Sequence, residues 1–227
     1  MPTKTSRSLF AELLGTATLV CVVIGSGIMA ETLTNDGALA MYVNAFSVAT
    51  ALGVLIALFG PISGAHFNPV VTLVMLWRKS ISARLAWLFI PAQIVGAIIG
   101  AMVAHVMFDQ AAYQISTHVR NTHGMWIGEI VATAGLLFVI IQLVDTEQDK
   151  WIPIAVPAWI ASAIFFTSST SFANPAVTIG RAFSNTFAGI APDSVPAFII
   201  FELIGGVLAV GLARFFKNQN QTETETE

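Results

Sequence analysis

The segment SFANPAVTIGR, residues 171–181, interrupts an apolar sequence with an Asn-Pro-Ala tripeptide that starts at Asn174. An earlier segment, SGAHFNPVVTL at 63–73, carries an Asn-Pro pair that starts at Asn68. Asn is a good helix N-cap and Pro is well tolerated at the first helical position, so a helix is predicted to begin at each Asn. The apolar stretch after each Asn is roughly ten residues long, enough for only half a bilayer. The sequence therefore predicts two half-helices.

The composition around these segments is that of a membrane protein. Hydrophobic residues make up 56% of the 227 residues and charged residues only 10%, with a mean hydropathy of +0.77, whereas soluble proteins carry about 25% charged residues. An all-α membrane protein with six transmembrane helices is predicted, and its candidate spans are Leu9–Met29, Met41–Gly60, Leu85–Phe108, Trp126–Val144, Ile152–Phe166 and Pro196–Phe216.

The distribution of basic residues predicts the orientation of these spans. If both termini share a side, only Arg120 and Arg181 flank spans on the opposite side. The positive-inside rule then predicts cytoplasmic termini. We expect one membrane domain over residues 1–217 and a polar, disordered tail over 218–227. The net charge of −3 gives no reason to expect a nucleic-acid partner, and the single Cys21 cannot form a disulfide framework within one chain.

The two halves of the chain, about 8–108 and 125–217, resemble each other. AELLGTATLV from Ala11 matches GEIVATAGLL from Gly128, so Glu12 corresponds to Glu129. Three spans per half force the second copy to insert upside down relative to the first. The half-helices then come from opposite faces and meet near the middle of the membrane.

The chemistry expected at this meeting point is that of a pore for neutral solutes. Two positive helix N-termini repel cations, and two Asn amides can donate hydrogen bonds to a water or polyol oxygen. Irregular backbone at membrane depth is tolerated only where it is buried in protein or lines a cavity. We therefore expect the carbonyls of two loops to line one wall, namely Gly64, Ala65, His66 and Phe67 in the first loop and Ser171, Phe172 and Ala173 in the second.

The paired motifs SGAHFNPVVT and ANPAVT, in six spans, resemble those of the aquaporin and aquaglyceroporin superfamily over about Leu9 to Phe216. This resemblance implies a six-helix bundle with two re-entrant half-helices, a pore in each subunit, homotetrameric assembly and location in the inner membrane. It also implies that Glu12 and Glu129 accept hydrogen bonds from the loop backbones. The pore boxes are then Asn68, Pro69, Val70, Asn174, Pro175 and Ala176.

Two positions depart from the family pattern. Val70 stands where the family usually has Ala, and Val177 stands where an Arg usually narrows the selectivity filter. By spacing from the two Asn residues, the other filter positions fall near Val48, Ser162 and Ser171. Such small and mostly apolar residues predict a filter that is wider and less positive than that of a strict water channel.

Arg181 lies four residues after Val177, on the same helix face. One hypothesis is that Arg181 places its positive charge in the vestibule, one turn away from the usual filter position at Val177. The alternative, which we favour at this stage, pairs it with Asp193 or a backbone carbonyl. His66 could act as a gate in the pore, but a hydrogen-bonded loop histidine is the favoured interpretation.

The function predicted from these features is a passive channel for small uncharged solutes such as glycerol, and for water. The combination of an NPAV box and a wide filter resembles bacterial aquaglyceroporins associated with arsenic resistance, which extends the expected solutes to arsenite and methylated arsenicals. The alternatives are a strict water channel narrowed by other residues and a secondary active transporter. No nucleophile–base pair or metal-ligand cluster accompanies the boxes, so we expect no enzymatic activity, metal or cofactor.

Overall fold

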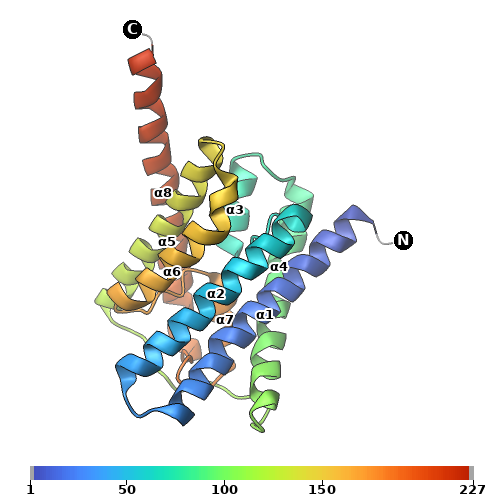
Figure 1. Ribbon diagram of the computed structural model, residues 1–227, viewed down its shortest axis with the longest axis vertical. Coiled ribbons are helices and arrows are strands. Elements are labelled where there is room, and N and C mark those ends of the chain that lie inside the picture. The colour runs from blue at the N-terminus through green and yellow to red at the C-terminus, as the bar shows by residue number, and fades with distance from the viewer. Residues whose placement is uncertain (1–2, 225–227) are drawn as a thin grey trace.

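The computed structural model describes the backbone of residues 3–224 and the side chains of residues 3–217. This part of the chain is all helical and contains no strand (Figure 1). Its α-helices are α1 (Lys4–Leu33), α2 (Gly37–Ser63), α3 (Pro69–Trp77), α4 (Ala83–Met107), α5 (His123–Asp145), α6 (Ile152–Phe166), α7 (Pro175–Arg181) and α8 (Val195–Thr224), with short 3-10 helices η1 (Asp149–Trp151) and η2 (Pro192–Ser194).

The six predicted spans are confirmed as helices long and apolar enough to cross a membrane, within the described residues. Most extend a few residues past the apolar stretch, because polar caps outside it start the helices. The Thr3 side chain accepts from Ser6 N at the start of α1, and the Asp36 carboxylate accepts from Ala38 N and Leu39 N at the start of α2. Hydropathy therefore locates the membrane crossing, and the caps set the helix ends.

The C-terminal boundary differs from the prediction. The polar composition predicts a disordered tail from residue 218, but α8 continues to Thr224. The sequence NQNQTET at 218–224 contains neither Pro nor Gly, so nothing in it terminates a helix that is already formed. The predicted tail residues 225–227 lie outside the described residues.

The packing of the helices follows the inverted repeat. Helix α1 packs against α2 and α4, and α5 packs correspondingly against α6 and α8. Each half-helix contacts both α4 and α8, and α3 also contacts α7. The two half-helices thus lie inside the ring of long helices, and the start of α1 and the end of α8 both lie toward the upper end of the bundle (Figure 1).

The contact between α1 and α4 is close enough to exclude any side chain at two glycines. A Cβ atom added to Gly96 would collide with the carbonyl oxygen of Leu13, and one added to Gly100 with that of Ala17. The two glycines lie on the same face of α4 as Gln93. Their packing therefore fixes the rotation of α4 so that Gln93 points toward Glu12, to which it donates a hydrogen bond of 2.8 Å.

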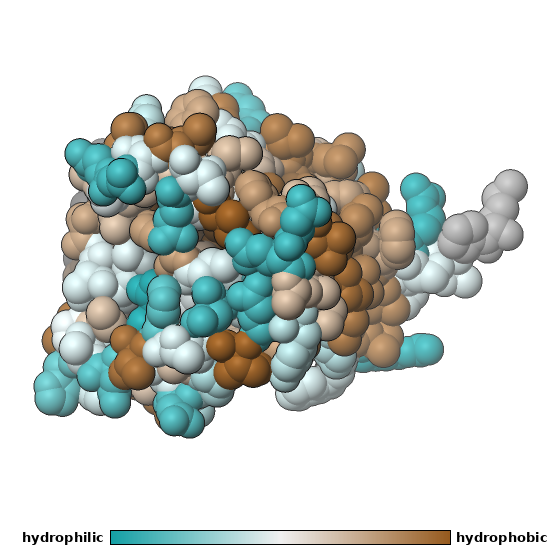
Figure 2. All heavy atoms as spheres, turned by 90° about the horizontal axis from the view of Figure 1, so that it is seen from below, coloured by the Kyte–Doolittle hydropathy of each residue, from teal (hydrophilic) through white to brown (hydrophobic). Residues whose placement is uncertain are grey.

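The outer surface of the bundle matches a lipid environment along its sides. Large apolar side chains such as Val54, Leu58 and Val207 are exposed on the long helices. Figure 2 shows the end of the molecule that lies at the bottom of Figure 1, where hydrophilic residues gather across the middle of the face. Apolar sides and polar ends are what a spanning bundle requires.

Candidate functional site

The two loops that precede the half-helices have the same backbone conformation. Ala65 and Phe67, three and one residues before Asn68, have φ values of 49° each. Ser171 and Ala173, three and one residues before Asn174, have φ values of 51° and 48°. These are left-handed conformations that cost an ordinary L-residue roughly 1–2 kcal/mol each. The surrounding structure must therefore hold both loops in place.

Two buried glutamates hold these loops through their backbone N–H groups. Glu12 accepts from His66 N at 3.0 Å and from Phe67 N at 2.7 Å. Glu129 accepts from Phe172 N at 3.0 Å and from Ala173 N at 2.7 Å. Both carboxylates are completely buried, and both are placed as the family resemblance implied. Hydrogen bonds to a charged acceptor are strong enough to offset the cost of the left-handed residues.

A third carboxyl group, that of Glu202 on α8, supports the second loop. Its Oε1 accepts from Asn174 N at 3.1 Å and from Thr178 Oγ1 at 2.7 Å. In the first half, the corresponding place is occupied by Gln93 on α4, whose Nε2 donates to Thr72 Oγ1 at 2.9 Å. Thr72 and Thr178 each lie four residues after the Asn of their box. Glu202 in the second half of the chain thus occupies the place that Gln93 occupies in the first half.

This correspondence predicts how Glu202 tolerates substitution. We expect Glu202→Gln to unfold at nearly the wild-type temperature, because an amide oxygen can still accept from Asn174 N. Glu202→Ala should lower stability by about 1–3 kcal/mol, because it leaves that buried N–H unpaired. Thermal unfolding of the detergent-solubilised variants, with exposed Leu203→Ala as the control, measures the difference. Equal destabilisation by Gln and Ala would contradict the correspondence.

The two box asparagines tie the loops together across the centre of the molecule. Asn68 Nδ2 donates to the Ala173 carbonyl at 2.7 Å, and Asn174 Nδ2 donates to the Phe67 carbonyl at 2.8 Å. Their Oδ1 atoms cap the half-helices, accepting from Val70 N and from Ala176 N. Each amide has two N–H donors, so one donor of each Asn remains for a solute.

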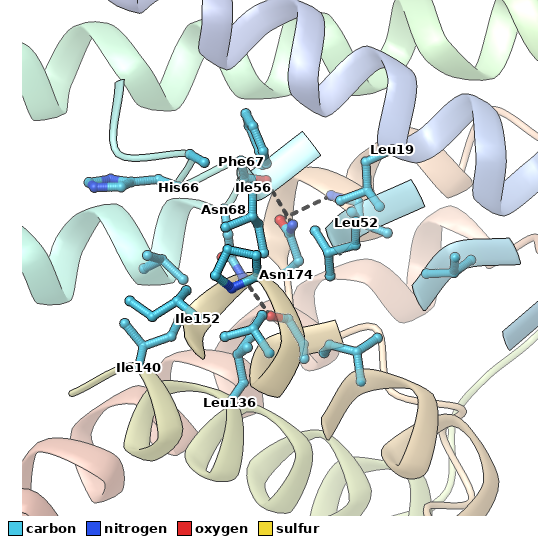
Figure 3. A pocket seen from close by; sticks show the side chains of 18 of the residues that line it. Leu19, Leu52, Ile56, His66, Phe67, Asn68, Leu136, Ile140, Ile152 and Asn174 are labelled. Atoms are coloured by element: carbon cyan, nitrogen blue, oxygen red, sulfur yellow. Dashed lines mark hydrogen bonds between the residues drawn. The ribbon is translucent and has the colours of Figure 1, made fainter. Parts of the chain in front are cut away.

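A cavity of about 900 Å³ runs past these asparagines (Figure 3). Asp149 and Lys150 line it at one end of the bundle, and Arg120 and Phe187 line it at the other. One wall consists of the loops and the box asparagines. The facing wall is apolar and is built by α1, α2, α5 and α6, with side chains that include Leu19, Val23, Leu52, Ile56, Leu136, Ile140, Val156 and Ile160.

Most of the predicted pore-lining residues line this cavity. They are Val48, Gly64, Ala65, His66, Phe67, Asn68, Ser171, Phe172, Ala173, Asn174, Val177 and Arg181. The remaining box residues Pro69, Val70, Pro175 and Ala176 do not line it and are buried in the first turns of α3 and α7. His66 Nδ1 lies 3.1 Å from Thr72 Oγ1, so the side chain is both hydrogen-bonded and pore-lining.

The predicted filter position on α6 is wrong. Ser162 is exposed on the outside of the bundle, whereas Ile160 and Ile164 line the cavity. Two residues correspond to about 200° around a helix, so a shift of two positions turns a side chain from the pore to the surface. The lining position nearest to Ser162 in the direction of the second loop is Ile164, which is more apolar than the serine expected there.

Two arginines lie against the ring of Phe172 at the end of the cavity opposite Lys150. The guanidinium carbon of Arg181 is 3.4 Å from the ring centroid, and that of Arg120 is 5.2 Å away. Arg181 Nε donates to the Ala188 carbonyl, and Arg120 Nε donates to the Gly189 carbonyl at 2.8 Å. Arg181 thus pairs with a backbone carbonyl through its Nε, as the favoured alternative expected. Arg181 also lines the cavity.

Burial and a neighbouring carboxylate act in opposite directions on the pKa of the Arg120 guanidinium. Burial lowers the pKa of the Arg120 guanidinium, and the nearby Glu129 carboxylate acts in the opposite direction by raising this pKa. Any solute that uses the cavity must pass a mouth lined by Arg120 and Arg181.

Sequence reasoning missed Arg120 and the α6 residues as parts of the cavity wall. Val156, Ile160 and Ile164 recur at intervals of four, which identifies one helix face. Nearly every residue of α6 is apolar, however, so the sequence does not distinguish the face toward the cavity from the face toward lipid. Arg120 lies in a long connection whose path no local pattern determines.

Sequence comparisons find relatives over most of this chain. Residues 2–171 match the family described as Major intrinsic protein. The chain is 44% identical over 210 residues to the aquaglyceroporin AqpS of Rhizobium meliloti (strain 1021), covering 92% of this chain and 90% of that protein. It is 30% identical over 222 residues to human aquaporin-5, covering 89% of this chain and 78% of that protein.

A solved structure shares the fold. The aquaglyceroporin from Plasmodium falciparum superimposes with a TM-score of 0.73 at 20% sequence identity, covering 93% of this chain and 95% of that one. The family match ends at Ser171, just before the second box, but the match to AqpS extends over both halves. On this evidence the chain belongs to the major intrinsic protein family, whose members form channels through membranes.

Proposed function

We propose that this protein is a passive channel for small uncharged solutes, glycerol and similar polyols among them, and for water. The observation that carries the proposal is the cavity that reaches both ends of the bundle with two asparagine amides at its centre. The name aquaglyceroporin, which belongs to the 44% identical relative AqpS, supports the same solute class.

The two walls of the cavity fit the chemistry of a polyol. Glycerol carries hydroxyl groups along one edge and C–H groups along the other. The carbonyls of the loops can replace water around the hydroxyls, while Leu52, Ile56 and Ile140 offer an apolar surface to the C–H groups. A charged solute would lose its hydration against that apolar wall at much greater cost.

We propose a wide filter formed by Val48, Ile164, Ser171 and Val177. All four side chains line the cavity, and only Ser171 is polar. A filter of this kind passes solutes larger than water, because no long polar side chain is fixed across it at Val177. Arsenite in its neutral As(OH)₃ form and methylated arsenicals fall into this size and charge class, and we include them in the proposal.

The alternative of a strict water channel depends on Arg181. This residue sits one turn from Val177, lines the cavity and contacts Phe172. A secondary active transporter would need a coupled ion site near the centre, but the carboxylates there, Glu12, Glu129 and Glu202, do not line the cavity and accept hydrogen bonds from the loop backbones. We therefore retain the water channel as the alternative.

Replacement of Arg181 separates these two functions. If Arg181 narrows the mouth, Arg181→Ala should speed glycerol permeation several-fold while water permeation changes little, because removal of a long side chain widens the route. The measurement is stopped-flow light scattering on proteoliposomes. Arg84→Ala, an exposed substitution away from the cavity, is the matched control. Unchanged selectivity in Arg181→Ala would leave the arginine with a structural role at the Ala188 carbonyl.

The proposal as a whole is tested by flux through the wild-type protein. Proteoliposomes should take up glycerol, urea and arsenite faster than protein-free vesicles, and they should also equilibrate water faster. Flux of water with none of the solutes would favour the strict water channel. Absence of any flux in vesicles that hold the folded protein would refute the channel.

We further propose that the protein is a homotetramer in the inner membrane with both termini in the cytoplasm. The basic residues Lys4, Arg7, Arg78, Lys79 and Arg214 support this orientation. The family resemblance supports the tetramer.

A further inference from the structure

A second, smaller cavity lies outside the pore, at the basic end of the bundle. It has a volume of about 350 Å³ and is lined by the end of α3, the end of α5 and the later part of α8. Its charged side chains are Arg78, Arg214, Lys217 and Asp145, so three cations face one carboxylate. None of these residues lines the pore, and the proposed channel activity does not use them.

The carboxylate in this cavity neutralises only one of the cations. Arg78 binds Asp145 through both terminal nitrogens, and this is the only ion pair among the described side chains of residues 3–217. The Nε of Arg78 is buried without a hydrogen-bond partner in that part of the chain. Among the described side chains of residues 3–217, no carboxylate forms an ion pair with Arg214 or Lys217. The cavity thus has an excess of two positive charges.

The position of Arg214 is fixed by an aromatic ring. Its guanidinium carbon lies 4.3 Å from the centroid of Trp77, within the range of a favourable cation–π contact. Trp77 is half-exposed at the end of the half-helix, where indole rings favour the membrane interface. The charge of Arg214 is therefore held at the depth of lipid headgroups rather than free to move in water.

The rest of the cavity wall is apolar. Ile141 of α5 and Val210 and Ala213 of α8 form it. Beside them, Leu208, Leu212, Phe215 and Phe216 are exposed on α8. A ligand that fits must carry negative charge at one end and hydrocarbon at the other. A free phosphate ion would satisfy the cations but leave the apolar part of the wall against water.

We propose that this cavity binds the headgroup of an anionic phospholipid. The phosphate contacts Arg214 and Lys217 beside the Arg78–Asp145 pair, and the upper part of the acyl chains packs against Val210 and the exposed side chains of α8. Basic pockets between transmembrane helices are sites of this kind in other membrane proteins. The lipid connects α3, α5 and α8, and so stabilises the half-helix from outside the pore.

The experiment measures the thermal unfolding midpoint of the detergent-solubilised protein during titration with short-chain phosphatidylglycerol. We expect a saturable increase, with no comparable increase from short-chain phosphatidylcholine or inorganic phosphate. The double variant Arg214→Gln, Lys217→Gln should need about 30-fold more phosphatidylglycerol for the same shift, because each basic group contributes to binding. Its glycerol flux should equal that of the wild type, which separates this site from the pore.

The matched control is the double variant Lys79→Gln, Arg84→Gln, which removes two exposed basic residues that do not line the cavity. It should bind phosphatidylglycerol like the wild type. The proposal is overturned if the control loses as much affinity as the cavity variant, since general surface charge would then explain binding. It is also overturned if phosphatidylcholine or inorganic phosphate gives the same shift.

Discussion

Replacing Val177 with Arg should reduce glycerol permeability by about tenfold or more while water still passes. Val177 lines the cavity one turn from Arg181. A guanidinium at this position extends into a filter whose other members are Val48, Ile164 and Ser171, and it narrows the route for a polyol. In the narrower filter, glycerol must give up at least one hydrogen bond to pass, which raises its barrier by about 1–3 kcal/mol. Since about 1.4 kcal/mol corresponds to a tenfold change in rate, the expected reduction in permeability is about tenfold or more.

Stopped-flow light scattering on proteoliposomes measures this effect, with glycerol, arsenite and water as the test solutes. Val177→Ala is the matched control, because it changes the same residue without adding length or charge, and it should conduct glycerol at least as well as the wild type. If Val177→Arg conducts glycerol at the wild-type rate, the filter lies elsewhere, and the pair of Arg120 and Arg181 is the next candidate.

The sequence predicts much of this architecture because its strongest signals are local. The caps at Asn68 and Asn174 depend on residues that follow immediately, and the structure has both half-helices starting at the next residue. The six spans follow from hydropathy. Glu12 and Glu129 are identifiable as a pair because the two halves of the sequence resemble each other, and the family resemblance implies their role as acceptors for the loop backbones.

The residues that sequence reasoning misplaced depend on long-range geometry. Spacing from the box asparagines points to Ser162 only if the loop between α6 and the second box has a fixed length. The face of an evenly apolar helix has no sequence signature, so Ile160 and Ile164 could not be preferred. Arg120 reaches the mouth from the connection between α4 and α5.

The pore depends on backbone that would not hold its shape alone. Six residues of the two loops, three in each, have positive φ and orient carbonyls that would otherwise relax. What fixes them is a set of buried acceptors behind the loops, chiefly Glu12 for the first loop and Glu129 for the second. The shape of the cavity wall therefore depends on two carboxylates, those of Glu12 and Glu129, that do not themselves line the cavity.

The loss of one such carboxylate should be the most damaging single change to stability. In Glu12→Ala, the buried N–H groups of His66 and Phe67 lose their acceptor, at about 1–3 kcal/mol each. Ser63 Oγ and Gln93 Nε2 lose theirs as well. We expect a large fall in the thermal unfolding midpoint in detergent and little folded protein in vesicles.

Two companion variants show whether the hydrogen bonds are the cause. Glu12→Gln keeps one acceptor oxygen and should fall between wild type and Glu12→Ala, since its amide nitrogen faces donors it cannot accept from. Glu31→Ala removes an exposed carboxylate from the same helix and should unfold like the wild type. A midpoint for Glu12→Ala equal to that of Glu31→Ala would mean that the first loop keeps its left-handed conformation without its acceptor. In that case the packing of Phe67 against Gly15 and Phe59, rather than the carboxylate, would be what shapes the pore.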